Sequence, residues 1–278
     1  MRNTVLVWRA ENDGIYTKQD AGKKIQKNMT VGNGYRSIGE EAFCGNIRLR
    51  NLELGESVEE IRQNAFRNCT SIKKIHMPGV RKIHQNAFSG CVNLQSAELD
   101  RTILLMERNA FAGCRRLTRV HLSRESKQKK IEEETFRECT SLRTAELPEE
   151  ITEIGQNAFY KCTELSSFFF SGSLRKIGQE AFYQSGLLTI ELPEGLEEIG
   201  QSAFLKCKKL EYVRIPRNTK IIGKWVFHGC DRLKVLEIAH DPEQIGEWIV
   251  NRSTHIRCHK GSRVDHYCQE NGFQTEYF

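Results

Sequence analysis

The chain has 278 residues, of which 38% are hydrophobic and 28% are charged, a balance typical of a folded protein rather than a disordered one. No apolar run approaches the roughly 18 residues that a membrane span requires, which argues against membrane insertion. The net charge of +6 comes from residues 1–40 and 124–130, so no long basic face can follow a phosphate backbone, and we expect no nucleic-acid partner.

Residues 1–34 do not fit the repeat that follows, and we expect them to form an N-terminal cap with a strand around Val5, Val7 and Trp8. Half a repeat unit would come from Ile25, Met29 and Val31. The apolar run at residues 5–8 is too short for a secretory signal. We therefore expect a cytoplasmic chain, unless a leader has been removed.

From residue 35 to residue 255 the sequence repeats about every 23 residues. Each repeat places a phenylalanine in register, and an Ile or Met stands five residues before it. The register phenylalanines are Phe43, Phe66, Phe88, Phe111, Phe136, Phe159, Phe182, Phe204 and Phe227, with Val250 as a degenerate tenth. A unit this short cannot bury its apolar face alone, so neighbouring units must stack.

The unit at residues 60–78 changes its apolar spacing midway. Over Ile61–Cys69 the spacing is roughly helical, which predicts a short helix or 3₁₀ turn. Ile75 and Met77 then alternate as in a strand with one buried face, and Pro78 ends it. The sequence therefore predicts one elongated array of nine or ten coils with the phenylalanines stacked inside. Parallel strands would line a concave sheet, and short helices or 3₁₀ turns would form the convex side.

Seven of the ten cysteines lie three residues after a register phenylalanine. They are Cys69, Cys91, Cys114, Cys139, Cys162, Cys207 and Cys230, and the same column continues with Asn46, Ser185 and Ser253. These small side chains suit a turn that brings backbone amides inward, so we predict a ladder of reduced, inert thiols. No Cys-x-x-Cys pair is present, and Cys258, His259 and Cys268 are too few to bind zinc, so we expect no metal and no cofactor.

On each predicted strand, the residue between the last two apolar positions faces out of the concave sheet. Along the array this column reads Glu53, His76, Glu98, His121, Glu146, Phe169, Glu191, Arg214, Glu237 and Arg257. The alternating Glu and His residues indicate cross-strand charge pairing. The alternative is a pH-sensitive or metal-recruiting strip, because histidine titrates near neutral pH.

Alternation within Phe168-Phe169-Phe170 buries the outer two side chains and exposes the middle one. Exposed aromatic and Arg side chains dominate binding energies at interfaces, so Phe169, Tyr212 and Arg214 are the central candidates. The full candidate binding strip is Phe169, Tyr212, Arg214, Glu191, Glu146, His121 and Arg119. A second candidate, on the outer side, is Tyr160, Tyr183 and Leu205, which would serve weak self-association of an otherwise monomeric chain.

The recurrent pattern Ile-Gly-x-x-Ala-Phe-x-x-Cys-x-x-Leu-x-x-Ile-x-Ile-Pro is clearest at residues 154–170, 177–193 and 199–216. It resembles the BspA-like, or Treponema-type, leucine-rich repeats over residues 35–258. Residues 256–278 are similar to the terminal unit of such arrays, and Ser262 and Gly272 can bound a short capping helix there. The resemblance implies a bacterial cell-surface or secreted protein with an adhesion or binding role.

We therefore expect an α/β repeat fold, a right-handed leucine-rich-repeat solenoid, acting as a non-catalytic binding module for a protein, peptide or glycan partner. The alternative is a structural spacer or an intracellular interaction scaffold without a dedicated ligand, which would lack clustered exposed aromatics on its concave sheet. An enzyme would need a carboxylate pair such as Glu146 and Glu191 on an open sheet that excludes no water, so we expect no catalysis.

Overall fold

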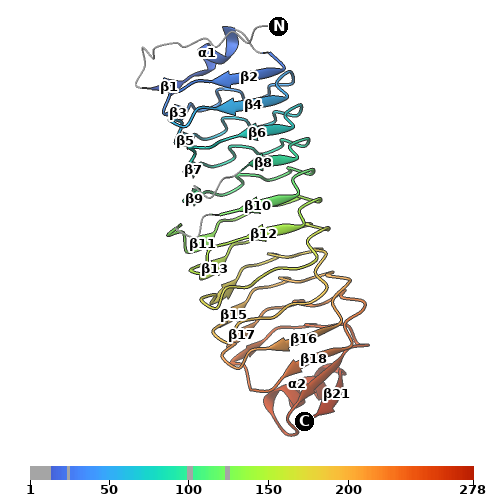
Figure 1. Cartoon of the computed structure of the whole chain (residues 1–278). Helices are drawn as coiled ribbons and strands as arrows, with labels where there is room; N and C mark the ends of the chain where they lie inside the picture. The colour runs from blue at the N-terminus through green and yellow to red at the C-terminus, as the bar shows by residue number, and fades with distance from the viewer. Residues whose placement is uncertain (1–13, 24–25, 99–102, 123–125) are drawn as a thin grey trace. The chain divides into compact units, whose positions relative to one another are not determined.

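The structure is a computed structural model that describes residues 14–23, 26–98, 103–122 and 126–278 (Figure 1). The chain forms two compact units, which we describe separately. Unit 1 comprises residues 1–128 and 134–148, and unit 2 comprises residues 129–133 and 149–278. The strand expected around Val5, Val7 and Trp8, and Ile25 of the expected half unit, lie outside the described residues.

Unit 1 is a stack of coils whose strands all pair in parallel. One sheet has the order β1-β3-β5-β7-β9, a second has the order β2-β4-β6-β8, and β10 pairs with β12. Figure 1 shows β2, β4, β6 and β8 side by side. The elements are β1 (Ile15–Tyr16), α1 (Lys18–Lys23), β2 (Asn28–Val31), β3 (Ser37–Ile38), β4 (Asn51–Leu54), β5 (Glu60–Ile61), β6 (Lys74–His76), β7 (Lys82–Ile83), β8 (Ser96–Glu98), β9 (Leu105–Met106), β10 (Arg119–His121) and β12 (Thr144–Glu146).

Unit 2 repeats the same construction with two parallel sheets. Their orders are β11-β13-β14-β15-β17-β19 and β16-β18-β20-β21. The elements are β11 (Lys130–Ile131), β13 (Glu153–Ile154), β14 (Lys176–Ile177), β15 (Glu198–Ile199), β16 (Tyr212–Ile215), β17 (Ile221–Ile222), β18 (Val235–Ile238), β19 (Gln244–Ile245), β20 (His255–Cys258), α2 (Arg263–Asn271) and β21 (Gln274–Tyr277). The predicted fold class is confirmed: both units are parallel β-solenoids with little helix.

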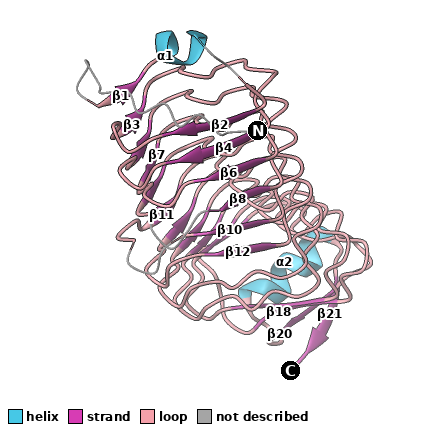
Figure 2. Cartoon of the chain, turned by 45° about the horizontal axis from the view of Figure 1, so that its top comes forward, coloured by secondary structure: helices cyan, strands magenta, loops and turns pink. Residues whose placement is uncertain are grey.

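The helical segment predicted over Ile61–Cys69 is wrong in detail. Glu60–Ile61 forms the short strand β5, and turns follow it. Asn64 and Asn68 have φ values of 56° and 59°, and a right-handed helix cannot continue through residues in the left-handed region. Among the described residues only α1 and α2 are helical, as Figure 2 shows in cyan. The register isoleucines therefore lie in a second parallel sheet of two-residue strands.

The register phenylalanines form the centre of each core, as predicted. All nine are at most 2% exposed. In unit 1 the ring of Phe66 stacks between Phe43 and Phe88, with centroid distances of 5.0 and 5.1 Å. In unit 2 Phe204 lies 5.3 Å from both Phe182 and Phe227. Each ring thus covers the next along the stack, and the repeat spacing of the sequence becomes one apolar column.

The cysteine ladder is also confirmed, and the structure identifies its acceptors. All ten cysteines are free thiols. The thiol of a column cysteine donates to the carbonyl of the register phenylalanine of the preceding coil, as in Cys69 to Phe43 (2.9 Å) and Cys230 to Phe204 (3.3 Å), and the same bond is present at Cys91, Cys114, Cys139 and Cys207. Ser253 departs from the column because it is exposed. Burial raises the pKa of the Cys114 thiol well above its ordinary value, so this thiol stays protonated and unreactive.

Helix α2 has the predicted ends. The Ser262 hydroxyl accepts the Asp265 N–H, and Gly272 takes the left-handed conformation at the C-terminal end. Val264 and Cys268 on this helix are fully buried. The helix packs against β20 and β21, and Figure 1 shows it beside β21.

Candidate binding surfaces

In unit 1, Arg119, His121 and Glu146 of the candidate strip lie on the paired strands β10 and β12. His121 and Glu146 are in register, and His121 Nδ1 lies 2.8 Å from a Glu146 carboxylate oxygen. Arg119 is exposed and in register with Thr144. The His121–Glu146 contact is the cross-strand pairing inferred from the sequence.

Among the described residues, no group of three His, Cys, Asp or Glu side chains is arranged to hold a metal ion.

Two strip residues of unit 2, Phe169 and Tyr212, are exposed aromatic side chains, and Leu188, which is not in the strip, is a further large exposed apolar side chain. Phe169 is 71% exposed, Leu188 48% and Tyr212 47%, and we call these three residues the aromatic surface. The flanking Phe170 is buried, and the half-buried Phe168 has its ring 5.0 Å from that of Phe182 in the core. The alternation expected within Phe168–Phe170 is therefore present, and its middle ring faces solvent.

Phe169 and Glu191 do not lie on strands, although the repeat pattern predicts strands there. Residues 166–170 and 187–193 have no regular secondary structure, and one backbone bond, from Leu188 N to Ser166 O (3.0 Å), joins the two segments. The inward position held by Ile75 in unit 1 and by Val213 on β16 is occupied here by Phe168. We attribute the missing strand pairing to this larger ring, which packs edge-on against the phenylalanine stack.

Tyr212 and Arg214 lie on β16, and both side chains have partners. The Tyr212 hydroxyl donates to Glu237 (2.8 Å), and Arg214 pairs with Glu194. Burial and the bond to Glu237 raise the pKa of Tyr212, so its phenol remains neutral and continues to donate. The ring of Tyr212 is therefore ordered before any ligand arrives, which lowers the entropy lost on binding.

Glu237 belongs to a polar network across the strands that follow. Arg257 on β20 pairs with Glu237 (3.5 Å) and with Glu276 on β21 (2.8 Å). These contacts raise the pKa of Arg257, chiefly through its hydrogen bond to Glu276. The face of this sheet is thus held by alternating charges, and each charge is matched to a residue in register on the next strand.

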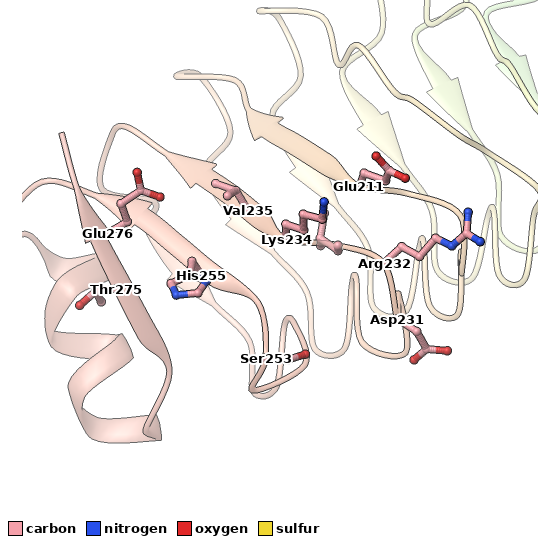
Figure 3. A pocket seen from close by; sticks show the side chains of 10 residues that line it. Glu211, Asp231, Arg232, Lys234, Val235, Ser253, His255, Thr275 and Glu276 are labelled. Carbon is pink, nitrogen blue, oxygen red and sulfur yellow. The ribbon is translucent and has the colours of Figure 1, made fainter.

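An open groove of about 890 Å³ lies beside this network at the start of β18, β20 and β21 (Figure 3). Lys234, His255 and Glu276 border it together with the apolar side chain of Val235. The remaining residues that line it are Glu211, Asp231, Arg232, Leu233, Ser253 and Thr275. No sequence pattern predicts this groove, although Tyr212, Val235 and His255 occupy successive register positions that continue the strip.

The outer tyrosines contact each other. Tyr160 and Tyr183 stack with centroids 4.7 Å apart, and Lys161 and Lys206 lie over their respective rings at 5.2 and 5.8 Å. Leu205, the third member of this candidate, is half-buried. Since these rings already have stacking and cation–π partners, they offer a partner less free surface than Phe169 does.

The two parallel sheets, the phenylalanine stack and the cysteine ladder define a repeat protein with a leucine-rich-repeat fold. The chain belongs to the family described as "BspA type Leucine rich repeat region", which matches residues 21–142 and 129–257 in six copies. This family is generally non-catalytic. No curated protein matches the chain.

Solved structures share the fold. A leucine-rich repeat protein from Bacteroides ovatus is 22% identical, with a TM-score of 0.60 over 86% of this chain and 72% of that one. A leucine rich cell surface protein from Faecalibacterium prausnitzii is 20% identical, with a TM-score of 0.51 over 91% of this chain and 88% of that one. No helix in the described part of the chain is long and apolar enough to cross a membrane.

Proposed function

We propose that the chain is a non-catalytic binding module of a bacterial cell-surface protein, and that it recognises a protein, peptide or glycan partner through its sheet face. The observation that carries the proposal is the aromatic surface of Phe169, Leu188 and Tyr212 in unit 2. Groups of large exposed apolar side chains mark interaction sites, and these three come from three successive coils. A structural spacer has no need of them.

The neighbouring polar groups favour recognition over nonspecific adhesion. Arg214 lies next to the exposed tyrosine on β16, and the groove residues Lys234 and His255 continue from it toward β21. Aromatic anchors surrounded by charged groups are typical of interfaces in which a few residues supply most of the binding energy. Arg119, His121 and Glu146 in unit 1 and Glu191 in unit 2 remain proposed contributors to binding. The likeness to a cell-surface protein of F. prausnitzii supports a surface location.

The test is to screen the whole chain on a glycan array and against a panel of purified extracellular-matrix proteins. Any ligand found is then measured with two double variants. Phe169→Ala/Tyr212→Ala should weaken binding by about 2–4 kcal/mol, the cost of removing hot-spot side chains. Their exposure predicts a change in stability within about 1 kcal/mol.

The matched control is Tyr160→Ala/Tyr183→Ala, which removes two stacked rings from the outer side. This variant should bind normally. Binding that survives the first double variant and is lost in the control would assign the function to the outer side. A chain that binds nothing in either screen would favour the structural spacer.

A further inference from the structure

The turns after each short strand contain residues with positive φ, and the first of them occupies the same position in every coil. This first residue stands two residues before the register phenylalanine, or before Val250 in the tenth coil, and we call the set the turn column. Its members are Glu41, Asn64, Asn86, Asn109, Glu134, Asn157, Glu180, Ser202, Trp225 and Trp248. Asparagine tolerates the left-handed region well, whereas a bulky side chain there is an outlier. Tryptophan in two successive coils therefore goes against the local preference of this position.

Stacking of the coils imposes this conformation, whatever residue occupies the column. Ser202 N donates to Lys224 O at 2.8 Å, and Trp225 N makes the equivalent bond to Glu247 O at 3.0 Å. The same ladder thus holds a serine turn and a tryptophan turn. Because the backbone requirement is identical, neither indole is needed to shape the turn.

Both indoles are also more exposed than most of the smaller residues of the column, of which only Glu41 is exposed as well. Asn64 and Asn157 are 8% exposed, whereas Trp225 and Trp248 are 38% and 40% exposed. Trp225 stands three residues after Ile222, and Trp248 stands three residues after Ile245. Because Ile222 and Ile245 are paired on neighbouring strands, the two tryptophans lie on adjacent coils spaced by about 4.8 Å. They are the only tryptophans among the described residues. The two side chains thus come from adjacent coils of unit 2, and one ring, that of Trp248, also packs edge-on against Phe273, with centroids 6.2 Å apart.

Charged groups surround the two rings. Lys224 and Glu247, which precede the two tryptophans, form an ion pair at 3.4 Å. The Arg252 guanidinium lies 5.2 Å from the centre of the Trp248 ring. A cationic ligand would meet repulsion from Arg252 and Lys224, and a flat apolar partner would have to desolvate an ion pair. The surroundings instead suit a neutral ligand that has both an apolar face and many hydroxyl groups.

We propose that Trp225 and Trp248 form a second binding site, separate from the sheet-face surface, for an unbranched hexopyranose oligosaccharide. A pyranose ring presents an apolar C–H face that stacks on an indole, and its hydroxyl rim bonds to polar side chains. Lys224, Glu247 and Arg252 supply donors and acceptors for that rim. Two indoles on adjacent coils would contact neighbouring sugar units of one chain.

The experiment uses the full chain carrying Trp8→Phe, so that only Trp225 and Trp248 contribute tryptophan fluorescence. Cellotetraose, chitotetraose and mannotetraose are titrated while tryptophan fluorescence is recorded, with sorbitol as an acyclic polyol that has no ring face. At least one tetrasaccharide should shift the emission saturably, and sorbitol should not. The proposal is overturned if none of the three shifts the emission.

Calorimetry with variants locates the site. Trp225→Asn/Trp248→Asn installs the residue that several coils already use in this column, and it should weaken the affinity about tenfold or more. Unchanged affinity for the tetrasaccharide would refute a binding site at Trp225 and Trp248. If the double asparagine variant does not fold, Lys224→Met/Arg252→Met replaces it, because this variant retains both indole rings. Its affinity for the tetrasaccharide should fall severalfold, and an unchanged affinity would also refute the proposed site.

Phe169→Ala separates this site from the proposed function. It should leave the tetrasaccharide affinity unchanged while it weakens the ligand of the aromatic surface. Loss of sugar binding in Phe169→Ala but not in the tryptophan variants would place the sugar on the sheet face and overturn the second site. Loss of sugar binding in the tryptophan variants alone supports the second site, whether or not the sheet-face surface is found to bind a ligand.

Discussion

Gly200→Ala should destabilise the protein strongly, because the coils of unit 2 are stacked too closely for a side chain at this position. Gly200 follows the register isoleucine of β15. A Cβ built there lies 2.7 Å from Gln179 N and 2.8 Å from the carbonyl carbon of Gly178. Both contacts are backbone atoms of the preceding coil, so no flexible side chain can move aside.

The size of the effect follows from these distances. Contacts of 3.4 Å or more are ordinary, so the two coils would have to separate by roughly 0.7 Å. The bond from Gly200 N to Ile177 O, now 2.8 Å, would lengthen toward the limit of a hydrogen bond. Overpacking costs about 1–3 kcal/mol and a weakened ladder bond adds about 1 kcal/mol, which gives a loss of about 2–4 kcal/mol.

Gly172→Ala is the matched control, because its Cβ would meet nothing within 4 Å. Both substitutions restrict the unfolded chain equally, so their difference reports the native-state clash alone. Urea unfolding followed by far-UV circular dichroism measures the two midpoints. Equal midpoints for the two variants would contradict the close-stacking argument.

Three further outcomes are expected. The native chain should expose one thiol, Cys44, to a thiol reagent and all ten thiols after denaturation, and native reaction of several thiols would rule out the buried ladder. Phe204→Ala should cost about 3–5 kcal/mol in chemical denaturation, since it removes a fully buried ring from between two stacked neighbours, and a loss under about 1 kcal/mol would argue against a packed column. Hydrogen bonds from the Gly261 N–H and, to a smaller extent, from the Tyr277 and Gln269 side chains lower the pKa of Asp265. The ionised Asp265 carboxylate therefore stabilises the fold at neutral pH, and this stabilisation is lost as the pH falls below about 4 and through the lowered pKa. The melting temperature of Asp265→Asn should therefore lie below wild type at pH 7 and converge with it in acid, and a constant gap would refute the linkage.

The repeat made most of the core predictable. A 23-residue period places Phe66, Cys69 and Ile75 in equivalent positions of every coil, so one correctly interpreted unit determines all the others. The ladder of reduced thiols followed from the mixture of Cys, Asn and Ser in a single column. The acceptor of a column thiol, such as the Phe43 carbonyl that accepts from Cys69, could not be predicted, because it depends on how far one coil is offset from the next.

The second sheet was missed because apolar spacing alone cannot distinguish a helical turn from a strand followed by a turn. Asn64 and Asn68 carried the missing signal. Asparagine recurs two residues before the register phenylalanine, and glycine recurs two residues after it, as at Gly90 and Gly113. Both residue types favour positive φ, which excludes a helix through the segment.

The candidate strip was predictable in its column positions but not in its contacts. Phe169 was correctly placed in solvent from alternation alone. The pairing of Tyr212 with Glu237 joins side chains from neighbouring strands that are offset by two positions, and it depends on rotamers that a sequence column does not specify. The groove near His255 likewise depends on loops that follow no repeat.

In a repeat protein the departures from each column carry the functional information, because the stacked coils already fix what each position requires for folding. Phe169 is an exposed ring in a column of charged residues, and Trp225 and Trp248 are bulky rings in a column that elsewhere holds Asn, Glu or Ser. None of these three side chains is required by the backbone conformation of its coil. Replacing them with smaller residues should therefore change binding far more than folding, whereas the same truncation at Phe204 should do the reverse.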